Sequence, residues 1–340
     1  MYFASDNTAG AHPDVLKALV KVNSGFVGAY GDDPITAALQ DRLRAIFEHD
    51  ELIAFPIATG SSGNALALAT MTPGWGAVYC HGEAHINVDE CGAPEVANPG
   101  SKLVPLDGVN GKFTADSVMS SMRGRDFVHA VQPSTISVTN LTEVGSAYTV
   151  EELQDLGEFC RKEKLSFHMD GARFANALVS TNASPADLTW RAGVDVLTFG
   201  ATKNGCMAAE AVIFFDPDRA QEFAFRRKRA GHLFSKMRFL SGQLIGYIEN
   251  DLWLQTARHA NAMAAKLARG LVAAGYRPYF PVEGNMVFAP IPEVVQKKLK
   301  DHGALFYPGR LGGTDGTDVR LLCSWSTTQA EVDKFVGLLG

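Results

Sequence analysis

The chain has 340 residues, of which 46% are hydrophobic and 20% charged, a composition that excludes an intrinsically disordered chain or a coiled coil. Its formal net charge is −6 at pH 7, so broad binding to the phosphates of a nucleic acid is not expected. No segment approaches the run of about 18 apolar residues that spans a membrane, and the start of the chain lacks the basic and apolar regions of a signal peptide.

The first third of the chain predicts helices alternating with short strands. A helix is expected over 33–48, because Asp33 suits the N-cap and Pro34 the first helical position, and apolar residues then recur at helical spacing. An apolar run over 52–56 leads into a Gly-Ser-rich turn, after which a helix is expected over 64–70. Further apolar runs predict strands over 76–80, 102–106 and 127–132.

The middle of the chain continues this alternation. A capping box formed by Thr149 and Glu152 opens a helix with a regular apolar face. Three strand-like runs follow, over 165–169, 194–199 and 211–215. Short strands alternating with helices predict an α/β fold with a mainly parallel central sheet and helices on both of its faces.

After about residue 250 the pattern changes. A long helix is expected over 251–274, strands over 285–291 and 318–323, and a last helix opened by a capping box at Thr328. We therefore expect a large domain over 1–250 and a small C-terminal α+β domain over 251–340, with the N-terminal tail near their junction.

The cysteines indicate the compartment. There are five of them, an odd number, and no pair has the C-x-x-C spacing, so neither a disulfide framework nor a four-thiolate zinc site is predicted. This pattern suits a reducing environment, and we expect a soluble, cytoplasmic protein.

Three groups in the predicted large domain point to chemistry. Asp170 ends one strand and Lys203 follows another, and the carboxyl ends of parallel strands meet at one edge of a sheet. The turn 59–64 opens a helix whose free N–H groups can bind a phosphate. Pyridoxal phosphate (PLP) needs a lysine that forms a Schiff base, a carboxylate facing the ring nitrogen and a phosphate site. Each group alone is more often a cap or a solvated charge, but their order and spacing together predict PLP.

Beyond these groups, the chain resembles the threonine aldolases, a family of PLP enzymes related to aspartate aminotransferase. The motifs that carry the resemblance extend over almost the whole chain; they are Ser5-Asp6-Asn7, Ala29-Tyr30-Gly31-Asp32-Asp33, Thr59-Gly60-Ser61, Ala84-His85-Ile86, His168-Met169-Asp170-Gly171-Ala172-Arg173, Phe199-Gly200-Ala201-Thr202-Lys203-Asn204-Gly205, Ser235-Lys236-Met237-Arg238 and Val319-Arg320. Segments 89–95, 208–211 and 226–232 are most similar to the phenylserine aldolase branch. The resemblance implies the fold of PLP-dependent transferases of fold type I.

The resemblance also implies how the cofactor is held. Lys203 carries PLP, Asp170 faces its pyridinium nitrogen, and Gly60 and Ser61 hold its phosphate. Arg173 lies near the phenolic oxygen and can also reach the substrate.

Other residues are implied to complete the site. His85 stacks on the ring, and Ser5 and Arg320 bind the substrate carboxylate, for which a planar guanidinium is suited. Tyr30, toward the substrate, and Arg238, toward the cofactor, come from a neighbouring subunit, so a homo-oligomer, dimer or tetramer, is expected. His81 and His85 have the i,i+4 spacing of a metal pair, but no third ligand at a known spacing accompanies them, and no metal site is predicted.

One departure from the family pattern bears on the substrate. Many threonine aldolases carry a histidine after Leu-Glu-Asn-Thr that is contributed across the subunit boundary toward the β-hydroxyl. The matching stretch 137–143 has Thr142 at or near that position and no histidine. We therefore expect Leu141 and Thr142 to leave room for an aryl group and to hold the hydroxyl less strictly.

These observations predict a PLP-dependent aldolase that cleaves L-β-hydroxy-α-amino acids (phenylserine, threonine, allo-threonine) to glycine and an aldehyde. His85, or a water that it positions, is the candidate base for the β-hydroxyl proton. β-Elimination or transamination on the same scaffold is the alternative. A nucleotide-binding oxidoreductase is disfavoured because neither G-x-G-x-x-G nor G-x-x-x-x-G-K-[ST] occurs, and a non-catalytic binding module is disfavoured by the intact lysine and aspartate.

Overall fold

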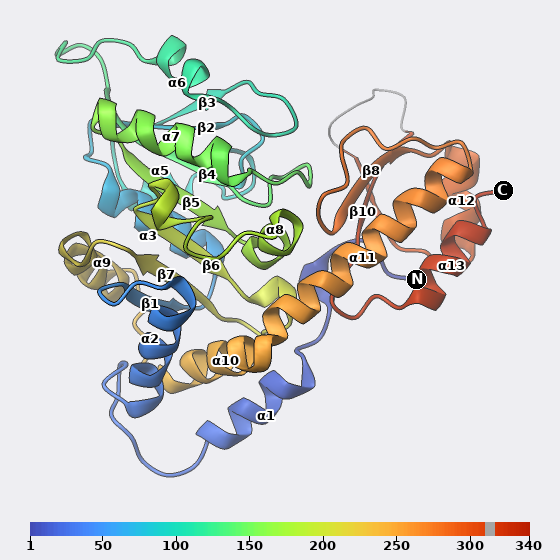
Figure 1. The fold of residues 1–340 in the computed structure, drawn as a ribbon, viewed down its shortest axis with the longest axis horizontal. Helices are drawn as coiled ribbons and strands as arrows, with labels where there is room; N and C mark the ends of the chain where they lie inside the picture. Colours follow the sequence, from blue (N-terminus) through green and yellow to red (C-terminus); the bar gives the residue numbers. More distant parts are fainter. Residues whose placement is uncertain (310–316) are drawn as a thin grey trace.

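The computed structural model describes residues 1–309 and 317–340. Its centre is a seven-stranded sheet in the order β1-β7-β6-β5-β4-β2-β3 (Figure 1). The strands are β1 (Ile53–Ile57), β2 (Gly76–His81), β3 (Lys102–Leu106), β4 (Gln132–Thr139), β5 (Ser166–Gly171), β6 (Val196–Gly200) and β7 (Glu210–Phe214). Only β7 runs against its neighbours, and all other pairings are parallel. The mainly parallel sheet predicted from the sequence is confirmed.

Helices cover both faces of this sheet. One face carries α3 (Gly60–Met71), α5 (Ala93–Ala97) and α9 (Pro217–Arg229), and the other carries α2 (Pro34–Phe47), α7 (Val150–Glu163), α8 (Phe174–Thr181) and α10 (Arg238–Ile248). Successive side chains of β6 divide between these layers, because strand side chains alternate: Val196 packs with α3, whereas Leu197 packs with the larger core. A Cβ at Gly63 would lie 2.9 Å from Cγ2 of Thr198, so glycine is what lets α3 approach β6 this closely.

A second, smaller sheet lies in the C-terminal part of the chain. Its order is β8-β10-β9, with β8 (Met286–Pro290), β9 (Tyr307–Pro308) and β10 (Asp318–Leu322), and α12 (Glu293–Asp301) and α13 (Gln329–Gly337) accompany it. The long helix α11 (Leu252–Ala273) runs from the large sheet toward this part (Figure 1). Phe3 is fully buried in the core of the small sheet, so the N-terminus lies beside α13. The division into two domains at residue 250 stays a prediction.

The remaining helices are short. They are α1 (Pro13–Val22), α4 (His85–Val88), α6 (Ala115–Ser121) and the 3-10 turns η1 (Asp6–Thr8), η2 (Trp190–Ala192), η3 (Thr202–Asn204) and η4 (Glu249–Asp251). Within the described ranges, no helix has the length and apolar composition needed to cross a bilayer.

Two predicted boundaries are wrong for a physical reason. The strand expected over 127–132 lies instead over Gln132–Thr139, as β4. Phe127 is exposed in a turn, and the buried part of β4 includes polar residues whose side chains form hydrogen bonds. Ser137, for example, lies 2.8 Å from Nδ1 of His168. The helix expected from residue 64 begins at Gly60, because the side chain of Thr59 caps it by accepting from the N–H of Ser62.

Candidate active site

A cavity of about 290 Å³ opens at the edge of the large sheet where β1, β2, β4, β5 and β6 end. Its walls come from the segments that follow these strands, and β7 begins at the same edge because it runs in the opposite direction. The carboxyl ends of parallel strands are where ligands bind in open α/β sheets. The cavity therefore gathers residues far apart in the sequence.

Asp170 and Lys203 border this cavity together. Asp170 is at the end of β5 and is 2% exposed, while Lys203 lies in η3, directly after β6. One carboxylate oxygen of Asp170 accepts from the N–H of Ala172 at 2.9 Å, and the other accepts from Nδ2 of Asn64 at 2.8 Å. The carboxylate is therefore buried and held in one orientation beside the lysine.

The first turn of α3 forms another wall of the cavity, through Gly60 and Ser61. The leading N–H groups of a helix have no acceptors within the helix and lie at the positive end of its dipole, which suits an anion. A Cβ on Gly60 would meet no atom within 4 Å, so the space beside this turn is open. The turn can receive a phosphate without rearranging.

His85 and the buried Glu90 form a pair that sequence reasoning missed. Nδ1 of His85 lies 2.8 Å from Oε1 of Glu90, whose side chain is fully buried. This hydrogen bond raises the pKa of His85 and leaves Nε2 as the nitrogen available to a ligand. The amide of Asn64 donates to both Glu90, at 3.0 Å, and Asp170, so one side chain joins the histidine pair to the aspartate. The only sign of Glu90 in the sequence is that it belongs to segment 89–95, which resembles the phenylserine aldolase branch.

Arg173 forms an ion pair with Asp6. Its Nε lies 2.7 Å from Oδ2 and its Nη2 2.9 Å from Oδ1 of that carboxylate, and both side chains are largely buried. Burial acts to raise the pKa of Asp6, but the charge and hydrogen bonds of Arg173 hold it below its usual value. Asp6 also accepts from Asn285, next to β8, so it ties the N-terminal tail to both sheets. The predicted contact of Arg173 with cofactor or substrate stays a prediction, with two of its donors already engaged.

Ser5 precedes η1 in the N-terminal tail and Arg320 lies on β10 of the small sheet, and neither residue lines the cavity. The hydroxyl of Ser5 caps η1 by accepting from the N–H of Asn7, which itself borders the cavity. Arg320, on β10, donates to the carbonyl of Ala4 at 3.4 Å. Arg320 therefore contacts the residue next to Ser5, and the predicted binding of a carboxylate by these two side chains stays a prediction.

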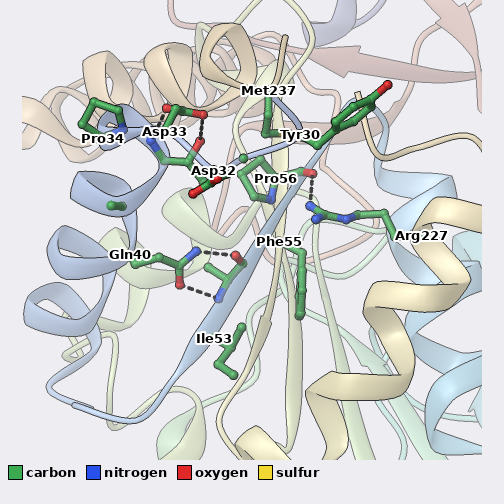
Figure 2. Close-up of a pocket in the computed structure, with 14 residues that line it drawn as sticks. Tyr30, Asp32, Asp33, Pro34, Gln40, Ile53, Phe55, Pro56, Arg227 and Met237 are labelled. Carbon is green, nitrogen blue, oxygen red and sulfur yellow. Dashed lines mark hydrogen bonds between the residues drawn. The ribbon is translucent and has the colours of Figure 1, made fainter. Parts of the chain in front are cut away.

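Tyr30 and Arg238 lie elsewhere in the same chain. Tyr30 is half-exposed at the rim of a second cavity, of about 480 Å³, where Figure 2 shows Arg227 donating to the carbonyl of Pro56. Arg238 donates to the carbonyl of Gly25 at 3.1 Å. Among the residues that the structure describes, neither a lysine nor a histidine lines this second cavity. The predicted contribution of Tyr30 and Arg238 to a neighbouring subunit stays a prediction.

The segment after β4 bears on one expectation. Thr142 is 1% exposed, and its hydroxyl contacts the hydroxyl of Ser146 at 2.8 Å, while Leu141 is packed in the core. Neither side chain therefore borders the cavity within one chain, and the expected room for an aryl group and looser hold on the hydroxyl stay predictions. The next residue, Glu143, borders the cavity instead.

Glu210, the first residue of β7, is a further acidic residue that the sequence did not single out. Its Oε2 accepts from the N–H of Ala201 at 2.7 Å, two residues before Lys203. Burial raises the pKa of Glu210 to about 7. This contact fixes the start of the segment that carries the lysine.

Comparisons with known proteins agree with this geometry. Residues 2–293 match the protein family described as "Beta-eliminating lyase". The chain is 42% identical over 332 residues to a low specificity L-threonine aldolase from Pseudomonas sp. (strain NCIMB 10558), covering 97% of this chain and 94% of the relative. It is also 42% identical over 327 residues to the protein of that name from Pseudomonas aeruginosa, covering 96% and 93%.

Solved structures agree as well. The structure of Leishmania major threonine aldolase matches with a TM-score of 0.93 at 29% identity, over 99% of this chain and 98% of that one. A structure of SPT with PLP matches with a TM-score of 0.73 at 14% identity, over 100% and 86%, and shows the fold alone. The predicted fold class, that of PLP-dependent enzymes of fold type I, is confirmed.

Proposed function

Because the chain belongs to the β-eliminating lyase family and, within it, to the threonine aldolases, we propose that it uses PLP to cleave L-β-hydroxy-α-amino acids to glycine and an aldehyde. The observation that carries the proposal is the meeting of Lys203, Asp170 and the first turn of α3 in one cavity. Two of the named relatives are low specificity L-threonine aldolases that match nearly their whole length, which supports the same activity here.

The donor set fits PLP. Lys203 would hold the aldehyde carbon of the cofactor, Asp170 its ring nitrogen, and Gly60 and Ser61 its phosphate. The orientation of the Asp170 carboxylate by two donors and the open space beside Gly60 support this assignment. When bound, PLP supplies an electron sink for the charge that remains on Cα as the Cα–Cβ bond breaks.

The residues of the chain have distinct tasks in this reaction. The buried carboxylate of Asp170 would lie beside the ring nitrogen of the cofactor. A negative charge there favours the protonated form of that nitrogen. Ser5 and Arg320 fix the substrate carboxylate and with it the L configuration at Cα. The β-hydroxyl proton must pass to a base before the bond can break, and His85 or a water that it positions is the candidate that the sequence offers.

The substrate's side chain is expected to vary in size. The small residues Ala58, Ala172 and Ala208 border the cavity and leave room for a ring, and no histidine occupies the segment after β4. An aryl group in an apolar pocket contributes a few kcal/mol of binding, whereas losing one directed hydrogen bond reduces discrimination by about 1 kcal/mol. These features support phenylserine as the preferred substrate and acceptance of both β-epimers.

Product analysis tests the proposal. The purified protein with PLP is expected to release glycine and acetaldehyde from L-threonine and L-allo-threonine, and glycine and benzaldehyde from both L-phenylserine epimers. We expect kcat/KM to be higher for phenylserine and the two epimers to differ by less than about tenfold. A keto acid with ammonia or an aminated cofactor as the product would support β-elimination or transamination instead. Strict selection of one epimer would contradict the proposed loose hold on the hydroxyl.

A shared active site would make activity depend on assembly. We infer that Tyr30 and Arg238 enter the cavity of a neighbouring subunit, since both lie apart from Lys203 within one chain. Arg238→Ala and Lys203→Ala are each expected to be inactive, whereas their mixture after dissociation and reassociation should recover roughly a quarter of the wild-type activity, because hybrids contain one intact site.

The control for this experiment mixes Lys203→Ala with Asp170→Asn, two changes in the same cavity of one chain. That mixture is expected to stay inactive, since no hybrid would contain an intact site. Recovery in the control, or an active monomer by light scattering at assay concentration, would contradict the shared site.

A further inference from the structure

Glu143 is a carboxylate in the candidate active site to which the site described above assigns no task. It borders the cavity together with Lys203, His85 and Asp170. Within residues 1–309 and 317–340, its side chain has no hydrogen bond or ion pair, in contrast to Asp170, Glu90 and Glu210. Its carboxylate is therefore available to a bound substrate.

The backbone around Glu143 holds it in place. Thr142 donates its N–H to the carbonyl of Ser146 at 2.8 Å, and Gly145 donates to the carbonyl of Thr142 at 3.0 Å. Both neighbours of Glu143 are held in place. The hydroxyl of Thr142 contacts that of Ser146 at 2.8 Å, and the side chain of Val144 is buried. A tight turn thus presents the Glu143 side chain to the cavity, and such fixed positioning is what a catalytic group needs.

Burial leaves Glu143 a stronger base than an ordinary glutamate. Burial raises the pKa of Glu143. The positive charges of Arg173, Lys203 and His85 act to lower this pKa, and the negative charge of Asp170 acts to raise it further. The outcome is a pKa above the usual value of 4.5. A base whose pKa lies closer to the operating pH accepts protons more effectively.

His85 is less suited to the same task. Its hydrogen bond to the buried Glu90 raises its pKa, which keeps the ring protonated up to a higher pH. A protonated imidazole has no lone pair with which to accept the hydroxyl proton. His85 is better suited to packing against a ligand or donating to it from Nε2.

We propose that Glu143 is the catalytic base that takes the β-hydroxyl proton, an inference that rests on the proposed aldolase function. The O–H bond breaks and its proton forms a bond to a carboxylate oxygen of Glu143. The electron pair of the O–H bond becomes the second bond of the aldehyde C=O, and the pair of the Cα–Cβ bond stays on Cα. Cα then takes up a proton, glycine leaves, and Glu143 returns its proton to solvent.

The test separates the β-hydroxyl step from the rest of the reaction. Glycine has no β-hydroxyl, so exchange of its Cα proton with deuterated water needs Lys203 and Asp170 but not this base. Glu143→Gln keeps the shape of the side chain and removes its charge, and it is expected to lower kcat for phenylserine cleavage by on the order of 10²-fold. Glycine exchange, followed by NMR, should stay within about threefold of the wild-type rate.

The pH profile gives an independent readout. A base must be unprotonated to act, so wild-type kcat/KM should fall as the pH drops through the pKa of Glu143, at a higher pH than for an ordinary glutamate. Glu143→Gln should lack this acidic limb. Glu158→Gln, the same change at an exposed position of α7, should leave the rate and the limb unchanged.

Other outcomes would overturn the assignment. Cleavage by Glu143→Gln within threefold of the wild type would show that another group takes the proton. An equal loss of cleavage and glycine exchange would show that Glu143 supports the whole site and not one step. If the wild type exchanges glycine but cleaves no β-hydroxy amino acid, the proposed function is wrong, and the inference about Glu143 is wrong with it. Cleavage by the wild type thus tests the function, and the comparison with Glu143→Gln tests the role of Glu143.

Discussion

Lys203→Ala is expected to lower kcat for cleavage by about 10⁴-fold or more, equivalent to about 5 kcal/mol in the activation barrier. The side chain borders the cavity and makes no hydrogen bond or ion pair among the residues described, so its truncation leaves no buried partner unsatisfied. The variant should therefore still fold, with only a modest loss of thermal stability, because the charge of Lys203 also favours the ionised forms of Asp6, Glu143 and Glu210. Lost catalysis without lost folding is the signature of a group that takes part in the chemistry.

Chemical trapping places the cofactor directly. Reduction of the wild-type protein with borohydride in the presence of PLP, followed by peptide mapping, is expected to find the adduct on Lys203. Lys162→Ala, a lysine on the exposed side of α7, should keep both activity and adduct. An adduct on any other lysine, or a Lys203→Ala variant with activity near the wild type, would contradict the assignment.

Much of the fold followed from local patterns. Helix caps at Asp33 and Thr149 and the alternation of short apolar runs with helices predicted the large sheet and its coverage on both faces. β4 was misplaced because its buried positions include Ser137, whose hydroxyl is satisfied by a histidine on the next strand. A pattern of apolar residues cannot reveal a strand whose polar side chains find partners only after the sheet has formed.

The site residues, too, divide into those that local sequence patterns predict and those that depend on tertiary contacts. Lys203 and Asp170 were predictable because each follows a strand, and the ends of parallel strands meet. Asn64 and Glu90 were not, because their importance depends on contacts between α3, β5 and the segment after α4. Glu143 was missed by one residue: the matching stretch drew attention to Thr142, and only the turn 142–146 decides which of the two neighbours enters the cavity.

Asp170→Asn tests the charge opposite the ring nitrogen, and it is expected to lower cleavage by about 10³-fold, or about 4 kcal/mol in the barrier. The change keeps the size of the side chain but removes the negative charge that favours a protonated ring. It also replaces an acceptor by a donor. The two oxygens of Asp170 accept from Asn64 and from the N–H of Ala172, and an amide can satisfy only one of these donors.

Two measurements then distinguish Asp170 from Glu143. Asp170→Asn should still bind PLP, seen as retained visible absorbance, yet lose glycine exchange and cleavage together, because stabilising charge on Cα is needed in both. Glu143→Gln should lose cleavage alone. Asp155→Asn, an exposed carboxylate on α7, is the matched control and should change neither. Near-native exchange by Asp170→Asn would mean that the buried carboxylate serves the fold, through Asn64 and the Glu90–His85 pair, and that the charge at the ring nitrogen comes from another group.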